Sequence, residues 1–228
     1  MNHASKRFRA LFASTLLAIA VLGQSTFSTT TPFTGGPRSR GVAFSVGKRV
    51  FMGMGTNTTT NVRQADIWEF NPTTGVWTQR ANFPGTGREG AVAFTVGDAA
   101  YVGMGTETGG VRKKDLWRYV PATNTWTQRA DIGGVARSNA VAFSIGTFGY
   151  VATGSGASGR LNDAWRYDPA SNQWTQRANF PGAARTEACA FAINSFGYVG
   201  LGSTTGGLAS DLYRFDPAGN AWAAMSAL

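Results

Sequence analysis

The sequence predicts an all-β fold built from four copies of one unit. The stretch DAWRYDPASNQWTQRA, which begins at Asp163, recurs as DIWEFNPTTGVWTQRA from Asp66, as DLWRYVPATNTWTQRA from Asp115 and, more loosely, as DLYRFDPAGNAWAAM from Asp211. The period is regular, since Trp77, Trp126, Trp174 and Trp222 are 49, 48 and 48 residues apart. Thirty glycines, seven tryptophans and a charged fraction of only 14% are typical of short strands joined by tight turns.

The N-terminal segment has the three parts of a secretory signal peptide. Residues 1–10 contain three basic side chains, residues 11–22 are mostly apolar, and small and polar residues follow from Gly23. The apolar run is shorter than the about 20 residues that a membrane span needs. We therefore predict a signal peptide over residues 1–23 and a secreted, extracytoplasmic protein. A membrane anchor or a disordered N-terminus is the alternative.

Charge and cysteine content limit the partners. Without the signal peptide the chain keeps 18 basic and 12 acidic side chains, a moderately basic balance that concerns association and solubility rather than fold. Nucleic acid is not expected as a partner, because export separates the protein from it, and the mature chain has no predicted membrane span. Cys189 is the only cysteine and cannot form an intramolecular disulfide. The repeat has Val42, Val92 and Val141 at its position, which predicts a small buried hydrophobe.

Each unit contains four strand-like runs. In the first unit they are GVAFSV, RVFMGMG, DIWEF and VWTQRA, rich in β-branched and aromatic residues and separated by Gly, Asn, Pro and Thr. No window after the signal peptide has a sustained helical period, so no helix is expected. We predict a flexible leader over residues 24–36 and a repeat domain over residues 37–228. Its four units are 37–85, 86–134, 135–182 and 183–228.

Four antiparallel strands in a repeated unit of about fifty residues are typical of a β-propeller blade. The unit resembles the kelch repeat: an arginine opens it, the second strand is aromatic and glycine-rich (YVGMG at 101–105, YVATG at 150–154, YVGLG at 198–202), and the fourth strand contains Trp. The diglycine of that family is here Gly-x-Gly or a single Gly. The resemblance covers nearly all of residues 36–225. The repeat is similar to those of secreted bacterial kelch-repeat proteins, and this resemblance implies a kelch-type propeller, here with four blades.

The repeated aromatic and acidic residues have structural interpretations. The aromatic residues of the third and fourth strands, such as Trp117 and Trp126, are expected to pack between adjacent blades, because each buries a large apolar area. Stacking against sugars is the alternative. The aspartates that precede the third strand, Asp66, Asp115, Asp163 and Asp211, are expected to bond nearby backbone amides.

The candidate binding residues lie where loops of variable length meet. Antiparallel order puts the long loops of all units on one face of a propeller, and variable loops on a rigid scaffold are where ligands usually bind. The candidates are Arg38, Arg40, Arg88, Glu89, Arg137, Arg185 and Glu187. The four repeated arginines could form a ring at the channel mouth that binds an anion or an acidic glycan. Their recurrence in all four units favours the structural interpretation, in which each arginine satisfies backbone carbonyls of the loop between neighbouring blades, so the non-repeating Arg40, Glu89 and Glu187 are the more informative candidates.

Enzyme motifs are weak. GTGREG at 85–90 and GSGASG at 154–159 match G-x-G-x-x-G without opening a helix, so they are turn glycines. The kelch family includes copper radical oxidases, so the resemblance implies that activity as one possibility. Those enzymes need histidine ligands, and the only histidine is His3 in the predicted signal peptide, so this activity is excluded. No metal or cofactor is expected.

The predicted function is a secreted, non-catalytic module that binds glycan, cell-envelope or protein ligands. The alternative is a carbohydrate-active enzyme, similar to kelch-type sugar epimerases, that uses Glu89 or Glu187 with neighbouring arginines.

Four blades are few for a propeller, and the chain ends six residues after Trp222. We therefore expect a truncated product or an incomplete ring. The end blades of an incomplete ring expose sheet faces, which would promote self-association.

Overall fold

The computed structural model describes residues 31–225 of the 228-residue chain. The predicted signal peptide, residues 1–23, lies outside the described residues, as do residues 24–30 of the predicted leader. Every regular element within the described range is a β-strand, so the all-β prediction is confirmed. This part of the chain has no helix long and apolar enough to cross a membrane.

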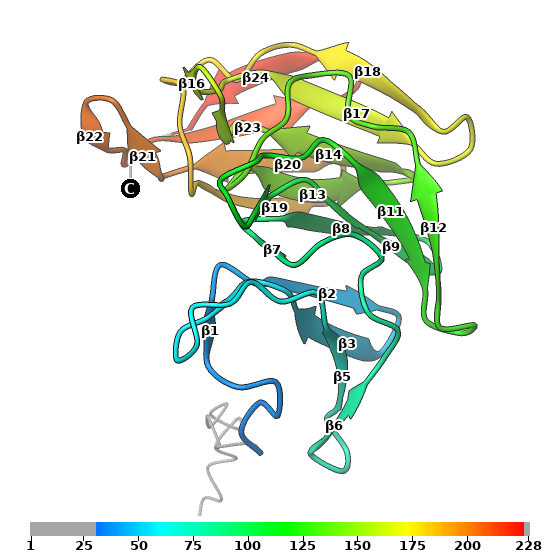
Figure 1. The fold of residues 1–228 in the computed structure, drawn as a ribbon. Helices are drawn as coiled ribbons and strands as arrows, with labels where there is room; N and C mark the ends of the chain where they lie inside the picture. Colours follow the sequence, from blue (N-terminus) through cyan, green and yellow to red (C-terminus); the bar gives the residue numbers. More distant parts are fainter. Residues whose placement is uncertain (1–30, 226–228) are drawn as a thin grey trace, which may run out of the picture. The chain divides into compact units, whose positions relative to one another are not determined.

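Four antiparallel sheets of four strands follow one another along the chain, and we call them blades 1 to 4 (Figure 1). Blade 1 consists of β2 (Val42–Val46), β3 (Arg49–Gly53), β5 (Ile67–Asn71) and β6 (Val76–Gln79), and blade 2 of β8 (Val92–Val96), β9 (Ala99–Gly103), β11 (Leu116–Val120) and β12 (Thr125–Arg129). Blade 3 consists of β13 (Val141–Ile145), β14 (Phe148–Ala152), β17 (Ala164–Asp168) and β18 (Gln173–Arg177), and blade 4 of β19 (Cys189–Ile193), β20 (Phe196–Gly200), β23 (Leu212–Asp216) and β24 (Ala221–Ala224). The strands pair in chain order within each blade, which confirms the predicted propeller blades.

The innermost strand of blade 1 shows why these sequences form strands. Val42, Phe44 and Val46 are buried, whereas the two residues between them are exposed, which is the two-residue period of a strand. The hairpin that follows turns at Gly47, whose φ of 58° is left-handed and suits glycine. The sequence thus specifies both the buried face and the position of the turn.

Consecutive blades are joined by apolar contacts. Each of three buried clusters contains residues of two successive blades. Trp117 and Trp126 of blade 2 pack against the cluster of blade 1, as predicted for these aromatic residues, and Trp126 Nε1 donates to the carbonyl of Ala81 at 3.0 Å. The contact leaves no spare room: Phe94 of blade 2 lies against Gly149 of blade 3, where a Cβ would come within 2.0 Å of the ring. Blade packing therefore depends on large aromatics that meet small residues.

The connections between second and third strands lie at the end of each blade opposite the hairpin turns, and we call this end the loop face. It carries four pairs of two-residue strands that the sequence did not predict, because they are too short to show a period. The pairs are β1 (Arg38–Ser39) with β4 (Thr56–Asn57), β7 (Arg88–Glu89) with β10 (Thr106–Glu107), β15 (Ser155–Gly156) with β16 (Gly159–Arg160), and β21 (Ser203–Thr204) with β22 (Gly207–Leu208).

Residues 31–36, the end of the predicted leader, pack on blade 1. The Phe33 ring meets Trp77 edge-on with centroids 4.9 Å apart, and Trp68 at 6.2 Å. Phe83 makes the same contacts with the tryptophans of blade 2. The spacing from Phe33 to Arg38 equals that from Phe83 to its own arginine, so the sequence did contain a signal for this packing.

The two end blades are not joined by a core. Within residues 31–225 no buried cluster links blade 4 to blade 1. Phe191 and Ile193 of blade 4 are 45% and 52% exposed. Cys189 is also exposed, so the prediction that it is a small buried hydrophobe was wrong. The valines at its position in the other blades are buried because a following blade covers them, and no described blade follows blade 4.

Candidate ligand site on the loop face

The four repeated arginines lie inside the blades rather than around an open mouth. Arg88, Arg137 and Arg185 are 0% exposed, and the side chain of Arg38 is 8% exposed. Each bonds the aspartate that precedes the third strand of its own blade and the carbonyl of a residue just after the second strand. These guanidinium groups are therefore engaged within the protein.

Arg137 shows the arrangement in detail. It meets the carboxylate of Asp163 in a two-pronged pair at 2.7 and 2.6 Å and donates to the carbonyl of Thr153 at 3.1 Å. Trp165 Nε1 donates to the same carboxylate at 2.7 Å. The sequence predicted backbone amides as the partners of these aspartates, whereas their main donors are an arginine and, in three blades, an indole.

This environment keeps the aspartate ionised. Burial raises the pKa of Asp163, but the hydrogen bond and charge of Arg137 and the bond from Trp165 outweigh it, so the pKa lies below its ordinary value. Asp66 in blade 1 has its pKa lowered in the same way. The carboxylates of Asp66 and Asp163 are therefore charged at neutral pH, which suits a fixed structural link to their arginines.

The non-repeating residues are positioned by a ladder of backbone hydrogen bonds at the start of the innermost strands. One residue per blade has a left-handed φ there: Arg40 at 53°, Gly90 at 63°, Asn139 at 52° and Glu187 at 57°. The amides of Gly90, Asn139 and Glu187 donate to the carbonyls of Arg40, Gly90 and Asn139 at 2.9, 2.8 and 3.0 Å. Arg40 thus begins the ladder and Glu187 ends it. The side chain of Arg40 is 53% exposed and that of Glu187 is 50% exposed.

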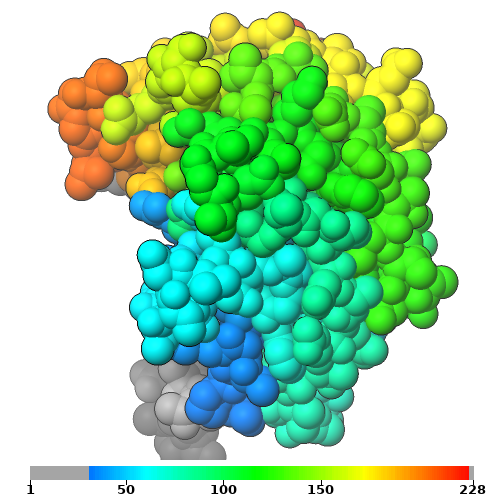
Figure 2. Space-filling view, viewed as in Figure 1, coloured from blue at the N-terminus to red at the C-terminus, as the bar shows by residue number. Residues whose placement is uncertain are grey.

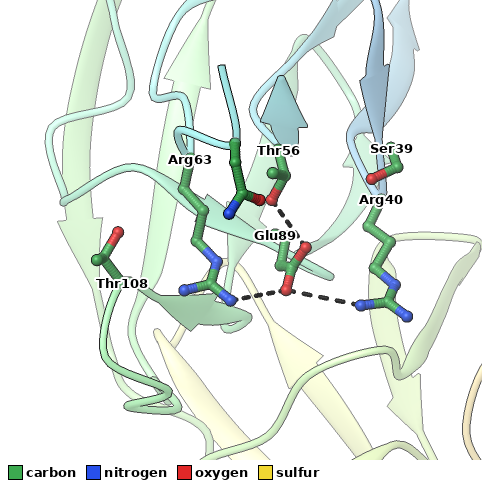
Figure 3. A pocket seen from close by; sticks show the side chains of 7 residues that line it. Ser39, Arg40, Thr56, Arg63, Glu89 and Thr108 are labelled. Carbon is green, nitrogen blue, oxygen red and sulfur yellow. Dashed lines mark hydrogen bonds and ion pairs between the residues drawn. The ribbon is translucent and has the colours of Figure 1, made fainter. Parts of the chain in front are cut away.

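Five side chains of these elements form a network that we call the loop-face cluster: Arg40, Thr56, Arg63, Glu89 and Glu187. Figure 3 shows the first four of them. Glu89 is its centre, since one oxygen accepts from Arg63 Nη2 at 2.8 Å and the other from the Thr56 hydroxyl at 2.8 Å. Arg40 lies farther away, 3.6 Å from Glu89 and 3.5 Å from Glu187. The structure thus brings together the three non-repeating residues that the sequence favoured.

Four members of the cluster, Arg40, Thr56, Arg63 and Glu89, line a hollow of about 560 Å³ together with Ser39, Asn61 and Thr108. Burial raises the pKa of Glu89, but the hydrogen bonds from Arg63 and Thr56 and the charges of both arginines outweigh it, and its pKa lies below the ordinary value. The hollow therefore presents an ionised carboxylate, one exposed guanidinium and several hydroxyl and amide groups. It can bind a polar ligand through hydrogen bonds.

Arg63 and Thr56 were not among the predicted site residues. Arg63 anchors Glu89 and also donates to the carbonyl of Glu107 in the next blade at 2.7 Å. Arg112 and Arg160 reach serines of the following blade from the same loop position, at 3.2 and 3.1 Å. A recurring loop arginine was the available signal. Among residues 31–225 no group of three or more His, Cys, Asp and Glu side chains is placed to hold a metal ion.

Comparison with known proteins identifies the repeat. The Kelch motif model matches residues 136–181, which make up the third unit of the sequence. A solved structure titled "Structure of YjhT" superposes with a TM-score of 0.72 over 88% of this chain and 68% of that chain, at 18% identity, a level that shows a shared fold only. The search of curated proteins finds no match. The matched unit is one of four copies of the repeat, and each copy folds as a blade, so the chain is a β-propeller that contains the kelch motif.

Proposed function

We propose that this protein is a non-catalytic binding module that acts outside the cytoplasm and holds a polar ligand at the loop-face cluster. The kelch propeller fold itself indicates a protein-interaction module. The glycan or protein nature of the ligand and the place of action are our proposals. They rest on the loop-face cluster and on the signal-peptide pattern of residues 1–23.

The observation that carries the proposal is the state of Arg40. Its side chain is 53% exposed, and its two carboxylate contacts are long, at 3.6 and 3.5 Å. Exposed ion pairs of this kind contribute about 0 to 1 kcal/mol to stability, so folding alone does not account for Arg40. By contrast, Arg137 is 0% exposed and bonded on all sides. Arg40 is therefore the guanidinium of this face that is available to a ligand.

The charge balance of the cluster narrows the ligand class. Arg40 and Arg63 face Glu89 and Glu187, so two positive charges meet two negative ones. A strongly anionic polymer would have to compete with carboxylates that are already in place. A ligand with alternating donors and acceptors, such as a glycan or a protein segment with both charges, can bond both arginines and glutamates. We therefore favour these over an acidic glycan.

A glycan array tests the proposal directly. We expect the purified protein to bind a set of glycans, and the Arg40→Ala variant to lose about tenfold or more in affinity for them, as truncation of a central contact does. The matched control is Arg118→Ala, which removes an arginine paired with Asp98 on the opposite, hairpin side. If the array is blank, a protein partner is favoured. If Arg118→Ala weakens binding as much as Arg40→Ala does, the site is elsewhere.

The enzyme alternative is kept by one observation: Glu89 lies 2.8 Å from Arg63 in a hollow, which is the pairing that a carboxylate-based sugar enzyme would need. The lowered pKa of Glu89 weighs against it, because a general acid at neutral pH needs a raised value. NMR of free sugars in the presence of the protein would settle this. Anomer or epimer exchange that Glu89→Gln abolishes would favour the enzyme, and no exchange would favour the binding module.

A further inference from the structure

We propose that the exposed face of blade 4, on the side away from blade 3, binds blade 1 of a second copy of this chain. Copies would then associate head to tail. We call this surface the blade 4 end face, and it consists of Cys189, Phe191, Ile193, Tyr198 and Leu212. The proposal does not depend on the binding role proposed for the loop-face cluster. It rests on how the molecule itself covers the same surface elsewhere.

The other three blades bury the counterparts of Cys189 and Phe191, and blades 1 and 3 also bury the counterpart of Ile193. Phe191 is 45% exposed, whereas its counterparts are almost fully buried: Phe44 at 8%, Phe94 at 3% and Phe143 at 6%. Ile193 is 52% exposed, against 7% for both Val46 and Ile145. The surface is already arranged for contact, since Phe191 stacks on Tyr198 at 5.1 Å and 11°, as Phe143 stacks on Tyr150 at 5.3 Å and 6°.

Within residues 31–225, what covers such a face is always the next kelch blade. The face of blade 3 is covered by blade 4, with Phe143 against Gly197 and with Tyr213 and Trp222 against the blade 3 core. Blade 1 carries the matching elements on its own uncovered side. There Val50 and Met52 are 37% and 38% exposed, whereas their blade 2 counterparts, Ala100 and Val102, are 0% exposed. Each copy thus presents both halves of one interface.

At the rim of the blade 4 end face, apolar residues occupy positions where other blades have arginines. Where the loops of blades 1 to 3 have an arginine that reaches the next blade, blade 4 has Leu208, which is 90% exposed on the projecting β21–β22 hairpin (Figure 2). Where Arg177 of blade 3 bonds the carbonyl of Pro217 at 2.9 Å, blade 4 has Met225, which is 40% exposed. Both changes extend the apolar surface, and large exposed apolar patches mark interaction sites.

Association through unlike faces is heterologous, and such contacts form closed rings or open chains. Two copies supply eight blades, within the range of about four to eight that propellers contain. The only ion pair in the described residues that spans blades 1 and 4, Arg40 with Glu187, is long and exposed, so it offers little resistance to a change in the spacing of the end blades.

One position makes the interface looser than those inside the chain. Blades 3 and 4 have Gly149 and Gly197 where the phenylalanine of the preceding blade lands, and a Cβ there would come within 2.0 and 2.3 Å of that ring. Blade 2 has Ala100, and blade 1 has the larger Val50. Phe191 must therefore shift to meet blade 1, and a smaller residue at position 50 should tighten the contact.

Sedimentation of the purified protein over a range of concentrations tests the proposal. We expect reversible association, weakened about tenfold or more by Phe191→Asp on one face and by Met52→Asp on the other. Val50→Ala should strengthen it. Val111→Asp is the matched control, because Val111 is 53% exposed on a blade 2 loop away from both end faces. All four sites are exposed in the single chain, and circular dichroism checks that each variant folds.

A mixing experiment gives the head-to-tail signature. Phe191→Asp keeps an intact blade 1 and Met52→Asp keeps an intact blade 4, so an equal mixture should associate more strongly than either variant alone. A wild-type protein that stays a monomer at about 100 µM would overturn the proposal and point to a different partner. A strong effect of Phe191→Asp with none of Met52→Asp would overturn it in favour of pairing between two blade 4 faces. An equal effect of Val111→Asp would refute a specific interface.

Discussion

Replacing Arg137 by alanine should destabilise the protein far more than replacing Arg40. Arg137 is 0% exposed, bonds both oxygens of Asp163 and donates to a backbone carbonyl, so its loss leaves a partly buried carboxylate without its charge partner. Removing one member of a buried ion pair costs about 3 to 5 kcal/mol. That is a large part of the about 5 to 15 kcal/mol that stabilises a typical domain.

The same substitution at Arg40 should cost about 1 kcal/mol or less, because this side chain is 53% exposed and its carboxylate contacts are 3.5 and 3.6 Å long. The two variants remove the same atoms from the same kind of residue. Their difference therefore isolates burial and bonding. The matched pair separates a framework arginine from one that is free to bind a ligand.

Urea unfolding followed by tryptophan fluorescence and circular dichroism measures both free energies. Coincident transitions by the two probes would justify a two-state treatment for this repeat protein. The variant Arg137→Lys should fall between the wild type and Arg137→Ala, because lysine keeps the charge but not the two-pronged geometry. A loss below about 1 kcal/mol for Arg137→Ala, or equal losses for the two alanine variants, would refute the reasoning.

Three further predictions concern the framework. The folded-state pKa of Asp163 lies below its unfolded value of about 3.9, so the stability that Asp163 contributes is complete above that pH and is lost as the pH falls through the lower folded value. Urea midpoints measured from pH 6 to pH 2 should therefore fall steeply below about pH 4. A flat profile in that range would contradict this prediction. Gly182→Ala should cost about 1 to 3 kcal/mol, because its Cβ would lie 2.5 Å from the buried Arg185 guanidinium, whereas Gly206→Ala, whose nearest neighbour is 3.8 Å away, should change the melting temperature little. Asn172→Ala should cost about 2 kcal/mol in urea unfolding, because the Asn172 side chain accepts from a backbone amide of blade 2 at 3.0 Å and from a tyrosine hydroxyl at 2.7 Å; an unchanged midpoint would show that this link is dispensable.

The fold was predictable because the sequence contains four copies of one repeat unit. Strand positions in blade 1 follow from alternation and turn residues, and the packing role of Trp117 and Trp126 follows from their regular register. Burial was less predictable at the ends of the repeat array. Cys189 occupies a valine position, and only the absence of a following blade in the described residues makes it exposed. A local pattern specifies which face of a strand is apolar, but not whether a neighbour covers it.

The candidate site was predictable in part. Arg40, Glu89 and Glu187 stood out because the other repeats lack them, and the structure brings them together. The buried state of Arg88 and its counterparts was left open, because the sequence alone does not show which partner a guanidinium chooses. The link to Asp115, 27 residues further along the chain, depends on the blade geometry. Arg63 was underestimated for the same reason, since its contacts cross from one blade to the next.

Departures from the repeat have two different causes, and the position of the blade separates them. Gly75 of blade 1 stands where blades 2 to 4 have an asparagine that bonds a backbone amide of the preceding blade, and blade 1 has no described blade before it. Leu208 differs at the other end of the array. Such differences lie on the sides of blades 1 and 4 that no described blade covers, and there the contacts of the repeat have no partner among residues 31–225. Glu89 lies in blade 2, which has a neighbour on each side, so its departure from the repeat has no such explanation, and together with the exposed Arg40 it supports a ligand on this face.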